Sequence, residues 1–366
     1  MDFYRILEKV VSGKFADTGE IATLLAPPDE TAEKALFDAA YQLKCEICGR
    51  MVNLRGLIEF SNICTRDCFY CGIRKSNGKV TRYRMSENEI VSAAEKALEF
   101  GYGSVVLQSG ERSDEEFAGF VERVVGKISA LAPGFGITLS CGEESLDTYR
   151  RWREAGATRY LLRIESSSEK IFNAIHPAEA LFSERKAALK RLQQAGFQTG
   201  SGVMIGLPGQ TLKDLAADIA FFRDMDLDMI GMGPYLPQTD TPLGQQYPDS
   251  GNMAEQRLQL SLRMIAVTRL VLRDVNIAAT TALQTIDPAQ GRERGILAGA
   301  NVIMPNVGDV AFRRDYQLYN GKPSLDENSL SIRENLIRSL AAIGEAPRFN
   351  SAGDPLHFFR RTGSGK

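Results

Sequence analysis

Short apolar runs alternate with longer segments of helical periodicity through the middle of the chain. In the longer segments, such as 211–225 and 253–272, apolar residues recur with the spacing of one helix face. Strands that alternate with helices are typical of parallel β/α units. Eight units in a chain of this length favour an α/β fold of the (βα)8 TIM-barrel type over an open doubly wound sheet. The expected strands are residues 54–60, 104–108, 137–140, 159–164, 198–205, 229–232, 277–279 and 302–304.

Polar residues and glycines mark the expected helix ends. Ser86 and Glu89 have the S-x-x-E spacing of a capping box, at the start of a helix that runs to Phe100. Glycines follow helical runs at positions where C-terminal caps are expected: Gly101, Gly156, Gly196 and Gly299.

Two further segments flank the expected barrel. Residues 1–50 are predicted to form a helical extension, and residues 325–366 to form one more helix, near 329–343, followed by a polar tail. No low-complexity tract or long Pro/Ser linker divides the chain. We therefore expect one large domain, the barrel at 51–324, with additions at both ends.

Composition and charge exclude several classes of protein. The 366 residues are 43% hydrophobic and 25% charged, and 44 Lys+Arg against 46 Asp+Glu give a net charge of −2. No strong positive field exists to hold nucleic acid, so none is expected as a partner. The first residues lack the apolar stretch of a signal peptide, and no run reaches the ~18 apolar residues of a membrane span. We expect a cytoplasmic protein without disulfides and without a membrane partner.

Five of the six cysteines lie between positions 45 and 71. Cys64, Cys68 and Cys71 follow the first expected strand with C-x3-C-x2-C spacing. Three thiolates on one short loop favour an iron–sulfur or zinc centre, because thiolate is a soft ligand. Three ligands leave one iron of a four-iron cluster open to an exogenous molecule.

A zinc ribbon is an alternative interpretation of the same cysteines. Cys45-x2-Cys48, followed by Cys64 and Cys68, approaches the C-x2-C-x15–20-C-x2-C pattern. The second pair has one residue too many, Cys71 is left over, and the first strand would lie inside the ribbon. We expect Cys45 and Cys48 to be bystanders, and the remaining candidate ligands to be structural: Cys141, His176 and His357.

The cysteine loop, with the aromatic Tyr70 before its last cysteine and a barrel strand before it, resembles that of the radical S-adenosylmethionine (SAM) enzymes. The resemblance implies one [4Fe–4S] cluster on Cys64, Cys68 and Cys71, with SAM chelating the open iron. In that family the reduced cluster passes an electron to the SAM sulfonium, which releases methionine and a 5′-deoxyadenosyl radical.

The same resemblance implies contacts to SAM at the carboxyl ends of the strands. Residues 108–111 resemble the Gly-Gly-Glu element that holds the SAM ammonium, Glu165 matches a ribose ligand, and Arg185 matches the carboxylate ligand. A tight Gly/Pro loop at 206–211 is expected near adenine. The expected SAM contacts are Tyr70, Gln108, Ser109, Gly110, Glu111, Ser140, Glu165, Arg185, Gly206 and Pro208.

Further phrases resemble the branch of this family that matures [FeFe]-hydrogenase: residues 55–62, 106–111, 206–211, 279–282, 300–306 and 316–319. This implies that the radical attacks the sulfur of an iron–cysteine complex carrying carbonyl and cyanide, on the way to the hydrogenase diiron subcluster. It also implies transient contacts with other maturation proteins and an electron donor. The residues expected to line the substrate cavity are Arg159, Thr280, Thr281, Met304 and Tyr319.

Two departures from the family leave alternatives open. No cysteine follows Cys141, so a second cluster near the end of the chain is not expected, and Ile164 stands where many relatives have histidine. A related enzyme with an amino-acid substrate, such as methylornithine synthase acting on lysine, is one alternative. A non-catalytic zinc-ribbon or iron–sulfur binding protein is the other.

Overall fold

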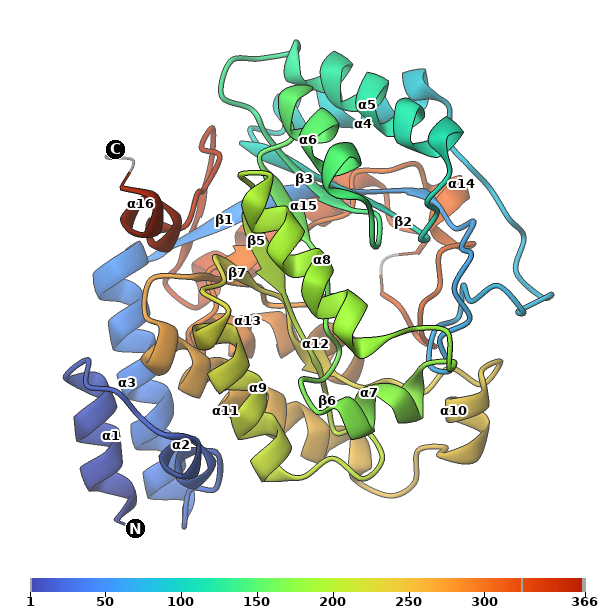
Figure 1. Cartoon of the computed structure of the whole chain (residues 1–366). Helices are drawn as coiled ribbons and strands as arrows, with labels where there is room; N and C mark the ends of the chain where they lie inside the picture. The colour runs from blue at the N-terminus through green and yellow to red at the C-terminus, as the bar shows by residue number, and fades with distance from the viewer. Residues whose placement is uncertain (1, 324, 364–366) are drawn as a thin grey trace.

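The computed structural model describes residues 2–323 and 325–363, and its centre is a parallel β-barrel (Figure 1). Backbone N–H groups close the ring between its two end strands, from Asn301 to the Ile277 oxygen and from Ala279 to the Val302 oxygen, at 2.9 Å each. All eight predicted strands are confirmed. In spatial order they are β10 (Val302–Ile303), β1 (Met51–Ser61), β2 (Ser104–Ser109), β3 (Gly136–Ser140), β4 (Arg159–Leu161), β5 (Gln198–Ser201), β7 (Met229–Ile230) and β9 (Asn276–Ile277).

Two predicted strands are interrupted rather than continuous. The runs at 198–205 and 229–232 each break after two to four residues, and the separate strands β6 (Met204–Ile205) and β8 (Gly233–Pro234) pair with each other. The segment between β5 and β6 contacts the segment between β7 and β8 at Gly202, where a Cβ atom would lie 1.7 Å from the Gly231 carbonyl oxygen. Glycine permits this close approach, and no other residue type would fit there.

Helices follow the strands and cover the outside of the barrel. The Ser86 capping box is confirmed, and the four glycines predicted as caps all have positive φ, between 75° and 123°. The helices from β1 to β10 are α4 (Glu87–Glu99), α5 (Glu115–Ser129), α6 (Leu146–Glu154), α7 (Glu169–Ile175), α8 (Phe182–Gln194), α9 (Leu212–Asp224), α10 (Pro242–Gln246), α11 (Met253–Leu272), α12 (Thr281–Ile286) and α13 (Gly291–Leu297). α14 (Val310–Arg313) follows β10.

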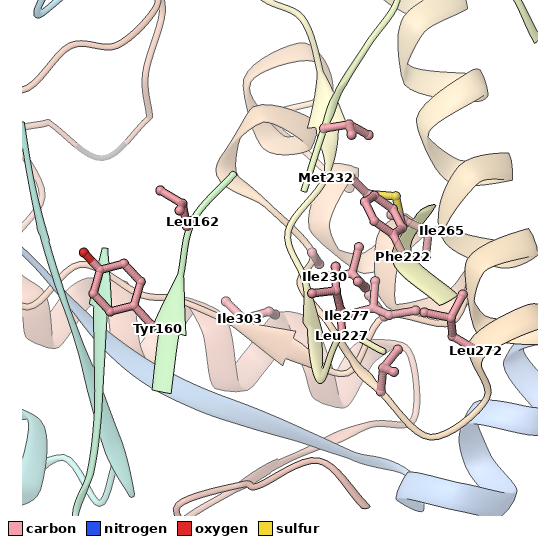
Figure 2. Packing of buried hydrophobic residues seen from close by; sticks show 14 of the residues in the cluster. Tyr160, Leu162, Phe222, Leu227, Ile230, Met232, Ile265, Leu272, Ile277 and Ile303 are labelled. Carbon is pink, nitrogen blue, oxygen red and sulfur yellow. The ribbon is translucent and has the colours of Figure 1, made fainter. Parts of the chain in front are cut away.

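Apolar side chains fill the space between the strands and the outer helices. Figure 2 shows part of this core, with Ile230 of β7 and Ile277 of β9 near Leu227, and Phe222 of α9 beside Ile265 of α11. Removing such surface from water is the main force that holds the helices on the barrel.

The N-terminal helices lie against α9 and α11, at the lower left of Figure 1. They are α1 (Phe3–Val11), α2 (Thr18–Leu25) and α3 (Glu30–Cys48). Lys44 of α3 forms a fully buried ion pair with Glu345, at 2.5 Å, and Tyr41 donates a 2.8 Å hydrogen bond to the same carboxylate. The extension is therefore fixed to the C-terminal segment as well as to the barrel.

The C-terminal segment contains the predicted helix, α15 (Ser329–Ala342), but the expectation of a simple polar tail after it is wrong. β11 (Ala346–Arg348) pairs with the first residues of β1, and α16 (Leu356–Thr362) follows. Between them, the Gly353 carbonyl accepts a 2.8 Å hydrogen bond from Asn276 at the amino end of β9. The tail is ordered because buried polar groups under the barrel need partners.

No helix in the described ranges is both long and apolar enough to cross a membrane. The domain boundaries at residues 50 and 324 stay a prediction.

Candidate cofactor and substrate site

Cys64, Cys68 and Cys71 lie on the loop after β1, at the carboxyl end of the barrel, and all three are half-buried. Burial raises the pKa of all three thiols, to about 12 for Cys68. A metal centre would replace these thiol protons, and the soft donor set fits iron–sulfur chemistry. Within the described residues, no group of three or more His, Cys, Asp or Glu side chains is arranged to hold a single metal ion.

The zinc-ribbon interpretation is wrong. Cys45 and Cys48 belong to the last turn of α3, before β1 begins, whereas Cys64 and Cys68 follow its end. A strand of 11 residues spans roughly 33 Å. The Cys48 thiol instead accepts a 3.4 Å hydrogen bond from Asn301, beside the amino end of β10.

Main-chain hydrogen bonds hold the cysteine loop against the end of β2. The Gly110 N–H donates to the Ser61 oxygen, and the Thr65 N–H to the Glu111 oxygen, both at 2.8 Å. A Cβ atom at Gly110 would lie 2.4 Å from the Ile63 oxygen, so a larger residue would push the loop away. The Glu111 N–H also points at the Cys64 sulfur, 3.4 Å away.

Two arginines and two glutamates form a closed ring of ion pairs beside this loop. Arg66 of the cysteine loop pairs with Glu111 through Nε and with Glu143 at 2.9 Å. Arg185 of α8 pairs with Glu143 through Nε and lies 3.6 Å from Glu111. The ring joins the cysteine loop, the ends of β2 and β3, and α8. The roles of Arg66 and Glu143 were not predicted. Arg66 lies between Cys64 and Cys68, but only the fold brings Glu143 to it across 77 positions of the chain.

A cavity of about 230 Å³ opens at the same end of the barrel and includes Cys71 in its wall. In that wall, the Tyr319 and Thr281 hydroxyl oxygens lie 3.1 Å apart. The predicted site residues that line the cavity are Tyr70, Gln108, Ser140, Glu165, Thr280, Thr281, Met304 and Tyr319.

The other predicted SAM contacts lie beside the cavity rather than in its wall. Glu111 and Arg185 are in the ion-pair ring, next to Ser109 and Gly110. Gly206 and Pro208 flank Leu207, which packs in the apolar cluster of Phe69 and Tyr70. Their roles stay predictions.

The prediction that Arg159 lines the cavity is wrong. Arg159 is the first residue of β4 and is fully buried at the amino end of the barrel, where it pairs with Asp354 and donates a 2.7 Å hydrogen bond to the Ala352 oxygen. The cavity contains Arg163 instead. The expected strand at 159–164 contains both arginines, and its alternation would place them on one face, so the periodicity alone did not distinguish them. The observed β4 ends at Leu161, and Arg163 lies in the segment that follows its carboxyl end.

Arg163 pairs with Glu165 at 2.9 Å, and both line the cavity. Glu165 has φ of 63°, which is unusual for a residue other than glycine and is typical of backbone held for function. Ile164 between them is completely buried and packs in the hydrophobic core. Position 164, where the sequence comparison expects a histidine in many relatives, is therefore not part of the cavity wall.

Two further pairs near the cavity were not predicted. Lys322 donates to both oxygens of Glu59, at 2.5 and 2.6 Å, and both residues line the cavity. His176 was expected to be merely structural, but its Nε2 lies 3.3 Å from the hydroxyl of Tyr70. Burial lowers the pKa of His176 to about 3, so it is neutral and orients the tyrosine by hydrogen bonding.

Known proteins resemble this chain over most of its length. The model of the radical SAM superfamily matches residues 58–222. The [FeFe] hydrogenase maturase subunit HydE of Thermotoga maritima is 39% identical over 343 residues, covering 93% of this chain and 94% of the relative. The 3-methylornithine synthase of Methanosarcina acetivorans is 25% identical, with 94% of each chain covered.

Solved structures show the same fold. Methylornithine synthase (PylB) has a TM-score of 0.80 at 23% identity, covering 94% of this chain and 98% of its own. The FeFe-hydrogenase maturase HydG from Carboxydothermus hydrogenoformans has a TM-score of 0.78 at 22% identity, covering 95% and 79%. With 39% identity to HydE over nearly the whole chain, this protein is a radical SAM enzyme of the HydE family, which uses a [4Fe–4S] cluster and SAM.

Proposed function

We propose that this enzyme acts in [FeFe]-hydrogenase maturation, on a small iron complex bound through a cysteine sulfur inside the barrel. The observation that carries the proposal is the position of the cysteine loop, whose Cys71 lies in the wall of a cavity of about 230 Å³. A radical formed at this loop reaches a small molecule in the cavity without crossing solvent. The similarity to HydE of Thermotoga maritima supports this function.

In this proposal Cys64, Cys68 and Cys71 are the cluster ligands. The bound cluster and SAM supply an electron and a 5′-deoxyadenosyl radical. Arg66 and Glu111 fix the loop that carries the cysteines, because their ion pair spans from the loop to the end of β2. Residues 51–324 form the catalytic barrel, between a helical extension at 1–50 and a C-terminal part at 325–366.

Contacts to SAM are assigned by the chemistry of each side chain. Arg185 binds the carboxylate through its terminal nitrogens, one of which also donates a 2.8 Å hydrogen bond to the Arg163 oxygen. Glu111 and the backbone of 108–110 accept from the ammonium. Glu165, held by its unusual backbone, accepts from the ribose hydroxyls. Tyr70, Ser140 and the loop at 206–208 complete the cofactor contacts.

The substrate occupies the rest of the cavity. Thr280, Thr281 and Tyr319 provide hydroxyl groups, Met304 provides an apolar contact, and Arg163 provides a cation in place of Arg159. A complex with carbonyl and cyanide ligands presents both apolar and acceptor surfaces, which this mixture matches.

Substrate-dependent SAM cleavage tests the proposal. Anaerobically reconstituted, reduced enzyme is incubated with SAM and either a synthetic iron–cysteine–carbonyl–cyanide complex or L-lysine. We expect the iron complex alone to stimulate 5′-deoxyadenosine formation or to capture the adenosyl group, as measured by mass spectrometry. Conversion of lysine would assign the enzyme to the methylornithine synthase reaction instead. Stimulation by neither compound would contradict both functions.

Maturation also requires other proteins. We propose transient contacts with the other hydrogenase maturation proteins and with an electron donor.

A further inference from the structure

Arg292 differs from the other cations in the cavity wall. It belongs to α13 and lines the cavity together with Arg163 and Lys322. Arg163 pairs with Glu165, and Lys322 pairs with Glu59. The Nε of Arg292 is buried and has no hydrogen-bond partner among the described residues. Three cations and two glutamates therefore leave one positive charge in the wall without a partner.

Other arginines also have a buried nitrogen without a hydrogen-bond partner, but their guanidinium groups are bonded elsewhere. Arg55, Arg74, Arg159 and Arg257 each donate at least one hydrogen bond through another guanidinium nitrogen. Within the described ranges 2–323 and 325–363, Arg292 forms no hydrogen bond or ion pair, and Glu293 and Glu327 attract its charge only from a longer distance. Burying a charge without a partner is costly, so an anion is the expected ligand.

Arg292 also extends the cavity. A side pocket of about 30 Å³ shares Leu57, Thr281, Arg292, Met304 and Lys322 with the main cavity, so Arg292 lies where the two spaces meet. α13 lies between β9 and β10, which is across the ring from β4 and its Arg163. A molecule in the cavity therefore has cations at two opposite ends.

We propose that Arg292 binds the carboxylate of the amino-acid part of the substrate, across the cavity from Arg163. This inference rests on the proposed function, in which the iron complex carries a cysteine. The planar guanidinium matches a carboxylate through two parallel hydrogen bonds, and the hydroxyl of Thr281 lines the same junction. Arg292 then acts as a binding residue that orients the sulfur towards the cysteine loop and takes no part in the bond changes.

Paired ligands with and without a carboxylate test the role of Arg292. Iron–carbonyl–cyanide complexes of L-cysteine and of cysteamine are titrated into reconstituted enzyme containing 5′-deoxyadenosine and methionine, and binding is followed by their infrared carbonyl bands. We expect wild-type enzyme to prefer the L-cysteine complex by roughly 10- to 100-fold. Arg292→Gln should lose this preference, and Arg292→Lys should keep part of it. Arg294→Gln, on the same helix but paired with Asp287 outside the cavity, is the matched control and should keep it all.

An unchanged preference in Arg292→Gln, or no preference in the wild type, would overturn the inference and leave the proposed function standing. Failure of the wild type to bind either iron complex would contradict the proposed function. In that case L-lysine and 1,5-diaminopentane, which differ by the carboxylate, are compared by calorimetry. Loss of the lysine preference in Arg292→Gln would still support a carboxylate site, and its persistence or the absence of binding would overturn it.

Discussion

The three cysteines after β1 differ from the other three in their surroundings. Cys45 lies on α3 at the opposite end of β1, whereas Cys68 lies in the loop beside the ion-pair ring. We predict that Cys68→Ala abolishes both cluster binding and SAM cleavage, because two thiolates cannot hold the cluster. Iron content, visible absorption and 5′-deoxyadenosine formation measure these losses.

Cys45→Ala is the control and should retain all three properties. Equal loss in the two variants would mean that the ligand assignment is incorrect.

Glu143 helps to hold the position of Arg185 by accepting a hydrogen bond from its Nε. It also accepts from Arg66, so its loss removes one of the carboxylate partners of each guanidinium group and leaves Glu111. We predict that Glu143→Gln weakens SAM binding to the reconstituted enzyme roughly 10-fold, by loss of a charge-assisted hydrogen bond. Equilibrium dialysis with labelled SAM measures this change.

Glu184→Gln, which removes an exposed partner of Arg191 on the same helix, should leave SAM affinity unchanged. An unaltered affinity in Glu143→Gln would contradict a positioning role for the ring.

Among the elements of the fold, the C-terminal segment provides the binding partner of Arg159 that was expected to be the substrate. Arg159 is fully buried, and its partner Asp354 comes from the loop between β11 and α16. We predict that Asp354→Ala lowers the free energy of unfolding by about 3 kcal/mol, because it leaves a buried guanidinium without its charge partner. Chemical denaturation of the full chain measures the effect.

Asp326→Ala, which removes the exposed partner of Arg314, should cost less than about 1 kcal/mol. SAM cleavage should survive in Asp354→Ala, because this pair lies at the end of the barrel away from Cys64, Cys68 and Cys71. Loss of SAM cleavage in an Asp354→Ala protein that is as stable as the wild type would indicate that Arg159 acts in the active site.

α16 is attached through a histidine, and its attachment should depend on pH. His357 lies 3.2 Å from Asp274 and 3.0 Å from Asp226, with Arg360 at 2.8 Å. Burial lowers the pKa of His357, but hydrogen bonding to Asp274 and the charges of Asp274, Asp228 and Asp226 outweigh it and raise the pKa above 6.5. The stabilisation is therefore complete below about pH 6.5 and is lost as the pH rises through the raised value.

We predict that His357→Asn destabilises the protein more at pH 6 than at pH 9, as measured by urea unfolding at each pH. An equal loss at both pH values would show that His357 acts by packing alone.

At the scale of the whole molecule, the order of strands and helices could be predicted because each strand is a short apolar run bounded by glycines and helix caps. The cysteine ligands could be predicted for a similar reason, since they are close in the sequence. The roles of Arg66, Glu143 and Arg292 could not be predicted, because the groups beside each of them at the site come from segments far apart in the chain. Arg159 was misplaced because the expected strand at 159–164 contains two arginines of the same alternation. The C-terminal segment beneath the barrel, which binds Arg159, shows that only Arg163 lies at the cavity end.

Hydrogen evolution by a matured hydrogenase measures whether this enzyme performs the HydE step of hydrogenase maturation. An apo-[FeFe]-hydrogenase is incubated with SAM, reductant and the other maturation proteins, with HydE omitted. We predict that adding the reconstituted wild-type protein restores hydrogen evolution, and that Cys68→Ala does not. Hydrogen evolution no higher than without the protein, from an enzyme that still cleaves SAM, would show that it does not perform the HydE step.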